Sequence, residues 1–493
     1  MCSVKRLIFV PFDQLHYGYG ALAGADPESD TLLLVESAQK IDSYRQRNHR
    51  LHFYLSSARH FAQEMTQRGF EVIYERAPSI PVGIAAVRAR INVDEVVCTT
   101  PSTFGQQRIL TQLGVKFVDN DFFLTSRALF DQWANGQKTY VMESFYRAQR
   151  VRLGILMDGS KPEGGQWNFD KENRLPPPKN YTWSPYLTHE IDEIDLEVGR
   201  EIGFEPAGTW ATSRSGARAQ LKNFVDNHLA HFGPLEDAMT TENWALHHSL
   251  LSPYLNIGLL HVSEVLEAVL ARHAKGDIPI ASTEGFVRQL IGWREYVNGM
   301  YWHLGADYKN SNNLGATGQL PEVFADSAKT QMRCVGSVVR DVAERGWVHH
   351  IPRLMVLSNF ALLAGINPQA FLRWMQDSFI DATEWVMVPN VIGMGLHADG
   401  GQMMTKPYVS GGAYISKMSD YCKGCKYNPK LRAGDSACPF TTLYWDFLDR
   451  HESQFTSNHR MKQQYFGLSR LADRDALKAR ANEVLSMLEQ GTL

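Results

Sequence analysis

The first 120 residues alternate short apolar runs with amphipathic segments. The runs have the length and the Val, Ile and Phe content of buried strands, and segments with helical spacing lie between them around 51–68, 80–91 and 104–113. Strands joined by helices of this length require right-handed crossovers, so the pattern predicts an α/β domain with a doubly wound parallel sheet. No G-x-G-x-x-G fingerprint for a dinucleotide follows the first run. The predicted strands lie at 7–12, 31–37, 70–76, 94–100 and 115–121.

The pattern changes twice further along the chain. Residues 161–185 are rich in Gly, Pro, Asn and aromatic side chains without a sustained period, which is typical of an ordered connector rather than a flexible linker. Beyond about residue 205 nearly every segment has helical periodicity, for example 284–302. We therefore expect an α/β domain at 1–130, a connector at 131–205 and a large all-α domain at 206–493.

The composition is that of an ordinary globular protein. The 493 residues are too many for one compact core, and 44% of them are apolar and 21% charged. A formal net charge of −3 excludes a global basic field, so contact with a nucleic acid would depend on a local basic patch. The apolar run at 7–10 is too short for a signal sequence or a membrane span. We expect a cytoplasmic monomer without membrane contact, in which clustered cysteines indicate metal or redox chemistry rather than disulfides.

Four of the six cysteines lie in the C-terminal half of the chain. Cys422 and Cys425 form a C-x2-C pair, Cys438 follows after a loop, and Cys334 must be brought in by the fold. Four thiolates suit either zinc or an iron–sulfur cluster, and the spacing alone favours neither. A third interpretation is that these are unrelated core residues, as we expect for Cys98. The lysines and arginines around the pair form either a solvated surface or a set of cations that offset a metal centre or contact phosphates.

The segment 247–260 reads HHSLLSPYLNIGLL. Ser252 followed by Pro253 is typical of a helix N-cap and first turn. A helix N-terminus with the hydroxyl groups of Ser249 and Ser252 beside it is also a natural phosphate site. Taken alone, the segment indicates plain capping more strongly than phosphate binding.

Four segments, in this order, resemble motifs of the photolyase/cryptochrome family. Residues 248–255 match the flavin-phosphate motif T-S-x-L-S-P-Y-L, with histidine in the place of threonine. RQLIGWREY (288–296) resembles the core helix that ends in W-R-E-F or W-R-E-Y, with Gly292 inserted. GWVHHIPRLM (346–355) resembles the family's G-W-x-H-x-x-x-R helix. WMQDSFIDATEW (374–385) resembles the segment whose aspartates embrace the flavin ring.

Further segments resemble one branch of that family, the bacterial iron–sulfur branch of prokaryotic (6-4) photolyases and related cryptochrome-like proteins. They are PEGGQWNFDKENR (162–174) and the string at 404–429, together with the upstream cysteine. The family's usual G-G-W-Q-W is replaced by VMVPNVIGMG (386–395). The resemblance covers essentially the whole chain. It implies that a [4Fe–4S] cluster is held by Cys334, Cys422, Cys425 and Cys438.

The resemblance also implies that the helical domain binds FAD. Arg353 is expected to pair with Asp381 beside the flavin ring, where the two charges would favour the anionic reduced flavin. Met387 stands where the family commonly has asparagine, a departure that bears on the control of the flavin's redox state. The expected FAD-binding residues are His248, Ser249, Leu250, Leu251, Ser252, Gln289, Arg294, Arg353, Asp381, Thr383 and Glu384.

His349 and His350 are adjacent, so only one of them can face the flavin site from a helix. His350 aligns with the histidine of animal (6-4) photolyases. A (6-4) lesion needs a proton when a hydroxyl or amino group returns between the bases, and histidine titrates near neutral pH. We expect His350 to be the acid and His349 its packing or hydrogen-bonding neighbour. Gln289, where enzymes for cyclobutane dimers carry Glu, also favours the (6-4) lesion.

The activity implied by the resemblance is light-driven repair of (6-4) photoproducts, by electron transfer from reduced FAD to a lesion flipped out of damaged DNA. Trp374 is the expected aromatic electron relay, with Trp347 and Trp385 as further candidates. One alternative is a cryptochrome-type blue-light photoreceptor without repair activity. Another is a zinc-containing DNA-binding protein without photochemistry.

The N-terminal domain resembles the family's antenna-binding domain. PFDQL (11–15) follows the first strand at the C-terminal edge of the sheet, where such folds bind ligands. The resemblance implies a 6,7-dimethyl-8-ribityllumazine antenna, with Asp13, Gln14 and Glu36 as candidate hydrogen-bonding residues. An acidic residue after a strand is also typical of a turn or a cap.

Overall fold

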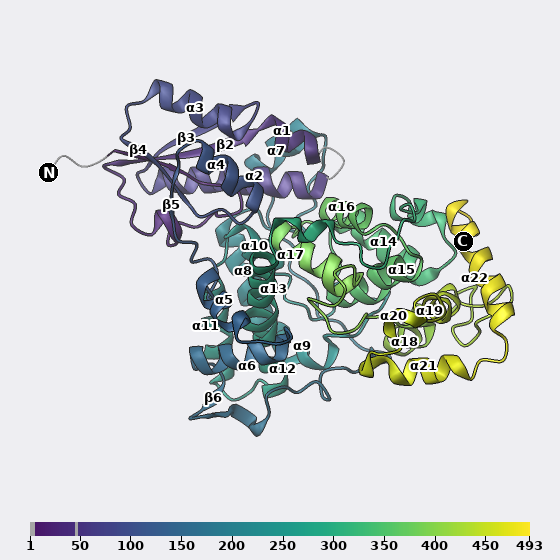
Figure 1. Ribbon diagram of the computed structural model, residues 1–493. Coiled ribbons are helices and arrows are strands. Elements are labelled where there is room, and N and C mark those ends of the chain that lie inside the picture. Colours follow the sequence, from purple (N-terminus) through teal and green to yellow (C-terminus); the bar gives the residue numbers. More distant parts are fainter. Residues whose placement is uncertain (1–4, 45–47) are drawn as a thin grey trace.

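The N-terminal part is built on a parallel sheet whose five strands have the order β3-β2-β1-β4-β5. The computed structural model describes residues 5–44 and 48–493. The sixth cysteine, Cys2, lies outside the described residues. Figure 1 shows this sheet and its helices as one body beside the helical remainder of the chain. The predicted α/β domain with a parallel sheet is confirmed. Its strands are β1 (Arg6–Phe9), β2 (Asp30–Ser37), β3 (Glu71–Ala77), β4 (Glu95–Thr99) and β5 (Lys116–Val118).

Both faces of the sheet are covered, because successive residues of each strand point to opposite sides. Leu7 and Phe9 of β1 belong to a small core with residues of α3 and α4, and Cys98 lies in the same core. Ile8, between them, belongs to the large core that includes α2 and continues into the helical part. Cys98 is therefore a buried core residue, as predicted. The helices of this part are α1 (Ala38–Tyr44), α2 (Asn48–Gln67), α3 (Ile80–Arg90) and α4 (Phe104–Gln112).

The stretch from 130 to 205 contains more regular structure than its sequence pattern indicates. Residues 166–192 have neither helix nor strand, as expected, but three helices and a small hairpin flank them. α5 and α6 pack on the helical body, whereas α7 returns to pack against α2. Asp192 and Asp195 form a capping box at the start of α7, and Gly203 ends it in the left-handed conformation. The elements are α5 (Arg127–Asn135), α6 (Met142–Leu153), β6 (Met157–Asp158), β7 (Lys161–Pro162) and α7 (Glu193–Ile202).

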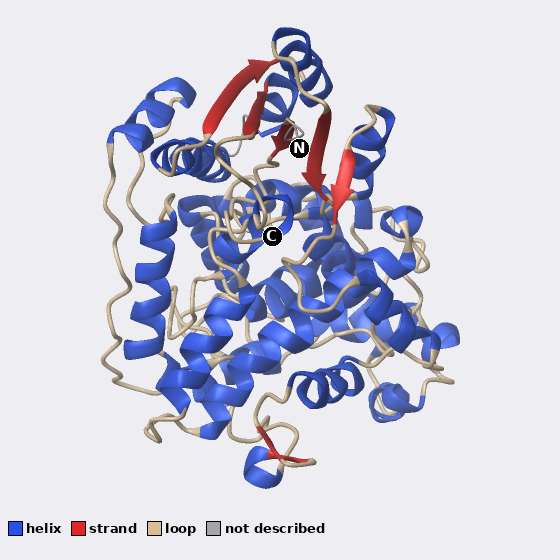
Figure 2. Cartoon of the chain, turned by 90° about the vertical axis from the view of Figure 1, so that its left-hand side faces the viewer, coloured by secondary structure: helices blue, strands red, loops and turns tan. Residues whose placement is uncertain are grey.

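The rest of the chain is helical, as the periodicity predicts. Figure 2 shows the strands of the parallel sheet at one end of the molecule, with helices filling most of the remainder. No described helix is long and apolar enough to cross a membrane. The α-helices are α8 (Arg214–Asn227), α9 (Leu229–Leu235), α10 (Ser252–Ile257), α11 (Val262–His273), α12 (Ile280–Val287), α13 (Glu295–Leu304), α14 (Arg333–Arg345), α15 (Asn359–Leu363), α16 (Pro368–Ser378), α17 (Glu384–Val388), α18 (Gly412–Met418), α19 (Pro439–Arg450), α20 (Glu452–Phe455), α21 (Lys462–Ser469) and α22 (Arg474–Glu489).

Nine further helical turns, of the π or 3-10 type, lie between these elements in the described ranges. Three of them are π-helical, namely η3 (Arg288–Arg294), η7 (Pro352–Ser358) and η8 (Pro389–Gly395). The others are 3-10 turns: η1 (Gly20–Leu22), η2 (Glu163–Gly165), η4 (Ala306–Asn310), η5 (Glu322–Phe324), η6 (Ser327–Lys329) and η9 (His459–Met461).

The packing of α13 on α5 requires a glycine, which gives a first prediction. A Cβ atom at Gly299 would overlap the ring of Phe130. We expect Gly299→Ala to lower the free energy of unfolding by about 1–3 kcal/mol, because overpacking forces side chains and backbone to shift. The matched control is Gly105→Ala in α4, where an added Cβ meets nothing within 4 Å. The control should leave the thermal unfolding midpoint unchanged or raise it, and an equal fall in both variants would contradict the prediction.

Candidate functional site

Three π-helical turns interrupt the helices where the sequence motifs fall. η3 carries Gln289 and Arg294, η7 carries Arg353, and η8 begins two residues after Met387. A π-turn holds one extra residue in a helix, and such bulges occur frequently at functional sites. η3 contains Gly292, the residue that the motif comparison marks as inserted. The bulge absorbs this extra residue, so the helix on either side keeps its register.

The centre of the site is an ion pair between Arg353 and Asp381. Two guanidinium nitrogens of Arg353 donate to the two carboxylate oxygens, at 2.9 and 3.0 Å. Ser252 Oγ donates to Asp381 Oδ2 at 2.7 Å, and Trp347 Nε1 donates to Ser252 Oγ at 3.3 Å. Asp381 is buried, and the paired geometry is the one that best offsets the cost of burying two charges. The pairing predicted from the resemblance is therefore present.

Ser252 does not cap a helix, contrary to the simpler interpretation of its sequence. It is the first residue of α10, and Leu251 stands at the N-cap without a side-chain hydrogen bond. The Ser252 hydroxyl is directed to Asp381 instead. Leu246 and Leu250, in the loop before α10, have φ values of 48° and 58°. Left-handed backbone is uncommon for leucine and costs free energy, and such strain clusters at functional sites.

Three histidines gather beside this loop. The rings of His248 and His349 stack with centroids 4.1 Å apart and an angle of 22° between their planes. Burial, followed by the positive field of neighbouring histidines, lowers the pKa of His248 to about 3. Burial and then Arg353 lower the pKa of His350 to about 4, and burial lowers that of His349 far below its usual value. The three imidazole rings are therefore neutral at pH 7 in the protein without a bound ligand.

His350 is exposed, whereas its neighbour His349 is buried. Gln289 and Arg353 are partly accessible although most of their helix neighbours are buried, and His248, in the loop before α10, is also partly accessible. These side chains therefore belong to the accessible part of the site.

The remaining predicted FAD-binding residues differ in how they are held. Gln289 Nε2 donates to the carbonyl of Gly285 at 3.0 Å. Arg294 pairs with Glu295 at 2.9 Å and leaves its Nε without a partner among the described residues. Thr383 Oγ1 is likewise buried and unpartnered in the described part of the chain. Glu384 is directed elsewhere, since it accepts from Tyr301 at 3.1 Å and lies 3.8 Å from Lys309.

Trp374 reaches the ion pair through a phenylalanine. Its ring centroid lies 6.1 Å from that of Phe379, and the guanidinium of Arg353 lies 4.2 Å from the Phe379 centroid. The other ring neighbours of Trp374 are Phe324 and Phe371, at 4.7 and 5.9 Å. Its indole donates to the Phe324 carbonyl at 2.8 Å. Trp374 is therefore fixed near the Arg353–Asp381 pair, and its ring neighbours are phenylalanines, which resist oxidation.

Two residues of the site have no signal in the sequence. Asn256 donates to the backbone carbonyl of Asp381 at 2.8 Å. Arg50, buried on α2 of the sheet domain, donates to the carbonyls of Gln376 and Ala382 on either side of Asp381. These partners are more than 300 residues away from Arg50, so only the fold brings them together.

The three predicted antenna residues differ in how they are held. Glu36 accepts from Tyr74 at 2.7 Å and pairs with Arg59 at 3.2 Å. Burial raises the pKa of Asp13, whose carboxylate is hydrogen-bonded to the Ser102 side chain. Gln14 Nε2 donates to the Thr100 carbonyl at 3.0 Å, while its Oε1 is buried without a partner among the described residues.

The fold brings the four C-terminal cysteines to one small cavity. Met332, Tyr421, Tyr427 and Phe440 are among the side chains that complete its wall. Burial, followed by the three neighbouring thiols, raises the pKa of Cys334 far above its usual value. A Cβ at Gly412 would lie 2.8 Å from Cys438 Sγ, so a glycine is needed there. The cysteines lining the cavity are Cys334, Cys422, Cys425 and Cys438.

Four thiols at one cavity suit either a zinc ion or an iron–sulfur cluster, because both take thiolate ligands.

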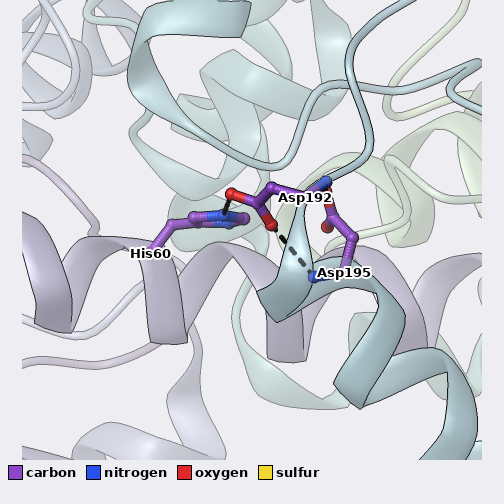
Figure 3. Close-up of side chains that lie close together, drawn as sticks. All are labelled: His60, Asp192 and Asp195. Atoms are coloured by element: carbon purple, nitrogen blue, oxygen red, sulfur yellow. Dashed lines mark hydrogen bonds and ion pairs between the residues drawn. The ribbon is translucent and has the colours of Figure 1, made fainter.

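A second group of possible metal ligands has a structural explanation. His60, Asp192 and Asp195 place three ligand atoms within 4.8 Å of one another. Figure 3 shows the three side chains close together, with His60 directed at Asp192. Asp192 accepts from His60 at 2.7 Å and from the backbone amides of α7, while Asp195 accepts from Thr212 at 2.7 Å. The carboxylates are therefore occupied in capping α7 and joining it to α2.

Comparison with known proteins gives matches along the whole chain. The family model of deoxyribodipyrimidine photo-lyase-related protein matches residues 8–210. A protein named (6-4) photolyase from Agrobacterium fabrum is 39% identical over 510 residues, which cover 99% of this chain and 100% of that protein.

Two solved structures share the fold. A bacterial class III photolyase from Agrobacterium tumefaciens aligns over 99% of this chain and 98% of its own, with a TM-score of 0.60 and 15% identity. A cryptochrome from Synechocystis aligns over 80% of this chain and 83% of its own, with a TM-score of 0.54 and 15% identity. At this identity the likeness shows the architecture alone.

The lowered histidine pKa values predict a loss of stability in acid. A histidine whose pKa falls on folding binds its proton only in the unfolded chain, so its stabilising contribution is complete above pH 6.5 and declines as the pH falls. For His248 the loss between pH 6.5 and 5 is about 2 kcal/mol, at about 1.4 kcal/mol per pH unit. His248→Thr should therefore lose less stability over this range than the wild type, measured by thermal unfolding. The exposed His459→Thr is the control, and an identical pH dependence in wild type and His248→Thr would refute the prediction.

Proposed function

The chain belongs to the photolyase/cryptochrome family, and from this premise we propose that it repairs (6-4) photoproducts in DNA with light. The relative named (6-4) photolyase matches along the full length, which favours repair over photoreception. The observation that carries the proposal is the Arg353–Asp381 pair, with the exposed His350 three residues before Arg353. This arrangement combines a charged site for a cofactor with a proton-carrying side chain.

Membership of the family implies FAD, and the predicted FAD-binding residues fit it. Three buried polar atoms of predicted FAD-binding residues lack partners in the described structure, and a bound cofactor would provide them: Arg294 Nε, Thr383 Oγ1 and His248 Nε2. Arg353 and Asp381 present a fixed charge pair against which the flavin ring would lie. Reduced FAD, when bound, supplies the light-driven electron for the damaged base.

His350 is proposed to hold and deliver the proton that repair needs. In the protein alone its pKa of about 4 keeps the ring neutral at pH 7. Bound DNA and an anionic cofactor bring negative charge, which raises the pKa of a nearby histidine. The proton is thus taken up at an imidazole nitrogen only when the site is loaded, and it is then available to the departing hydroxyl or amino group. His349, buried behind and stacked on His248, fixes the position of this part of the chain.

The four-cysteine cavity is proposed to hold a [4Fe–4S] cluster. The support is the convergence of four thiols on one cavity, a ligand set that suits an iron–sulfur cluster. Damaged DNA is the proposed partner, with the lesion flipped toward His350. For the 6,7-dimethyl-8-ribityllumazine antenna the support is confined to Asp13 and the unpartnered Gln14 Oε1, because Glu36 is tied into ion pairs.

A light-dependent assay on an oligonucleotide with one (6-4) lesion tests the proposed reaction. The reduced, FAD-loaded protein should restore the bases under blue light and not in the dark. His350→Asn should slow repair by about 100-fold or more while FAD remains bound, since a general acid contributes at least that factor. His303→Asn, which alters a histidine bonded to Tyr140 and Asp131, is the control. A loaded, reduced wild type without repair would favour the photoreceptor function instead.

Metal analysis tests the cysteine site separately. Protein purified without oxygen should contain about four iron atoms per chain and show the broad visible absorption of an iron–sulfur cluster. Cys425→Ala should lose the iron, whereas Cys98→Ala, which alters a buried cysteine of the sheet core, should keep it. Stoichiometric zinc in place of iron would overturn the assignment.

A further inference from the structure

The aromatic part of the connector packs into the helical body at one defined place. Tyr186 is 41% exposed, and its ring centroid lies 4.9 Å from that of Trp244. Trp244 lies 5.7 Å from Trp347, which is buried. Three rings thus form a continuous row from the surface inward, at spacings typical of aromatic contact. A fourth ring, that of Trp210, lies beside the row, with its centroid 6.2 Å from that of Trp244 and 6.0 Å from that of Trp347.

The inner end of this row contacts the proposed flavin site directly. Trp347 Nε1 donates to Ser252 Oγ, which in turn donates to Asp381. The guanidinium of Arg353 lies 5.8 Å from the Trp347 ring centroid. The row therefore joins the solvent to the same ion pair that Trp374 approaches from another side.

The surroundings of Trp244 suit one-electron oxidation. Its indole N–H is buried and has no acceptor among the described residues. An oxidised Trp244 would therefore keep its proton and recover quickly by taking an electron from a neighbour. The nearby cation, Arg345 at 5.3 Å, is neutralised by Asp341 at 2.8 Å and Glu344 at 3.0 Å. Tyr186 is the ring in contact that can lose both an electron and a proton to its surroundings.

We propose that Tyr186, Trp244 and Trp347 form an electron path from the protein surface to the flavin site, separate from Trp374. This inference rests on the proposed function, because the electron acceptor is oxidised FAD excited by light. Trp347 gives it one electron, Trp244 restores Trp347, and Tyr186 restores Trp244. Tyr186 then releases its phenol proton to water and is returned to its starting state by one electron and one proton from a soluble thiol.

The contrast with Trp374 supports a separate path. The ring neighbours of Trp374 are Phe324, Phe371 and Phe379, and phenylalanine does not give up an electron under these conditions. Tyr186, Trp244 and Trp347 are all oxidisable and in contact. Trp183, on the same connector, contacts Tyr181 and His247 instead and stands outside the row.

Radical trapping tests the path without measuring repair. The FAD-loaded protein is illuminated with a nitroso radical trap and no thiol, and the adduct is located by peptide mass spectrometry. We expect an adduct on Tyr186 in the wild type, its loss in Tyr186→Phe and Trp244→Phe, and its persistence in Trp183→Phe. Trp374→Phe should also keep the adduct, because the two paths are independent. Equal flavin absorption and thermal unfolding midpoints show that each variant is folded and loaded.

The outcomes separate this inference from the function on which it rests. No Tyr186 adduct in a protein that binds FAD and repairs DNA after chemical reduction would overturn the path alone. An adduct on Tyr186 that survives Trp244→Phe, or disappears in Trp374→Phe, would also overturn it. Failure to bind FAD would overturn both proposals, since the path would have no acceptor.

Discussion

The buried carboxylate of Asp381 is the interaction on which the site depends. It accepts from Arg353 and Ser252, and its backbone carbonyl accepts from Asn256. Arg50 of the sheet domain holds the carbonyl of the next residue, Ala382. Removing one charge from a buried pair typically costs about 3–5 kcal/mol, because the other is left uncompensated. The donors lie on α10 (Ser252 and Asn256), η7 (Arg353) and α2 (Arg50), so the segment around Asp381 fixes these three elements relative to one another.

The three histidines beside this pair are held neutral. Burial lowers the pKa of each one; the Arg353 guanidinium adds to the shift for His349 and His350, whereas neighbouring histidines add to it for His248. Because the Arg353–Asp381 pair has no net charge, a further charge beside it would be desolvated without a partner. A ligand with negative charge favours protonation of these histidines, because each proton then pairs with the new charge. The site is thus suited to an anionic ligand without carrying net positive charge in advance.

The sequence predicts the sheet well and the site only in part. β2 and α3 match the runs at 31–37 and 80–91 to within a residue, because period and burial act locally. β5 is shorter than its run, since Asn120 Oδ1 accepts from the Phe122 amide and turns the chain. The sequence pattern does not predict helix α7, because its capping residues lie at the end of a long segment rich in turn-forming residues.

Within the site, the family resemblance correctly predicts the pairing of Arg353 with Asp381. The helix-capping preference, in contrast, gives the wrong role for Ser252. Its position before Pro253 is typical of a cap, yet its hydroxyl bonds a carboxylate 129 residues away. Nothing near Arg50 or Asn256 in the sequence marks either as part of the site. These contacts are set by tertiary packing, which periodicity and capping preferences do not describe.

The four-cysteine cavity and the Arg353–Asp381 site are joined by one helix. α14 begins at Arg333, next to Cys334, and Arg333 also donates to the carbonyl of Lys423 in the C-x2-C loop. The helix is capped by Gly346, whose left-handed backbone (φ 66°) turns the chain into Trp347. The 13 residues of the helix span about 18 Å, at about 1.5 Å per residue. The proposed cluster at one end would therefore anchor the rigid element that positions Trp347 at the other, a mechanical role that does not depend on electron transfer.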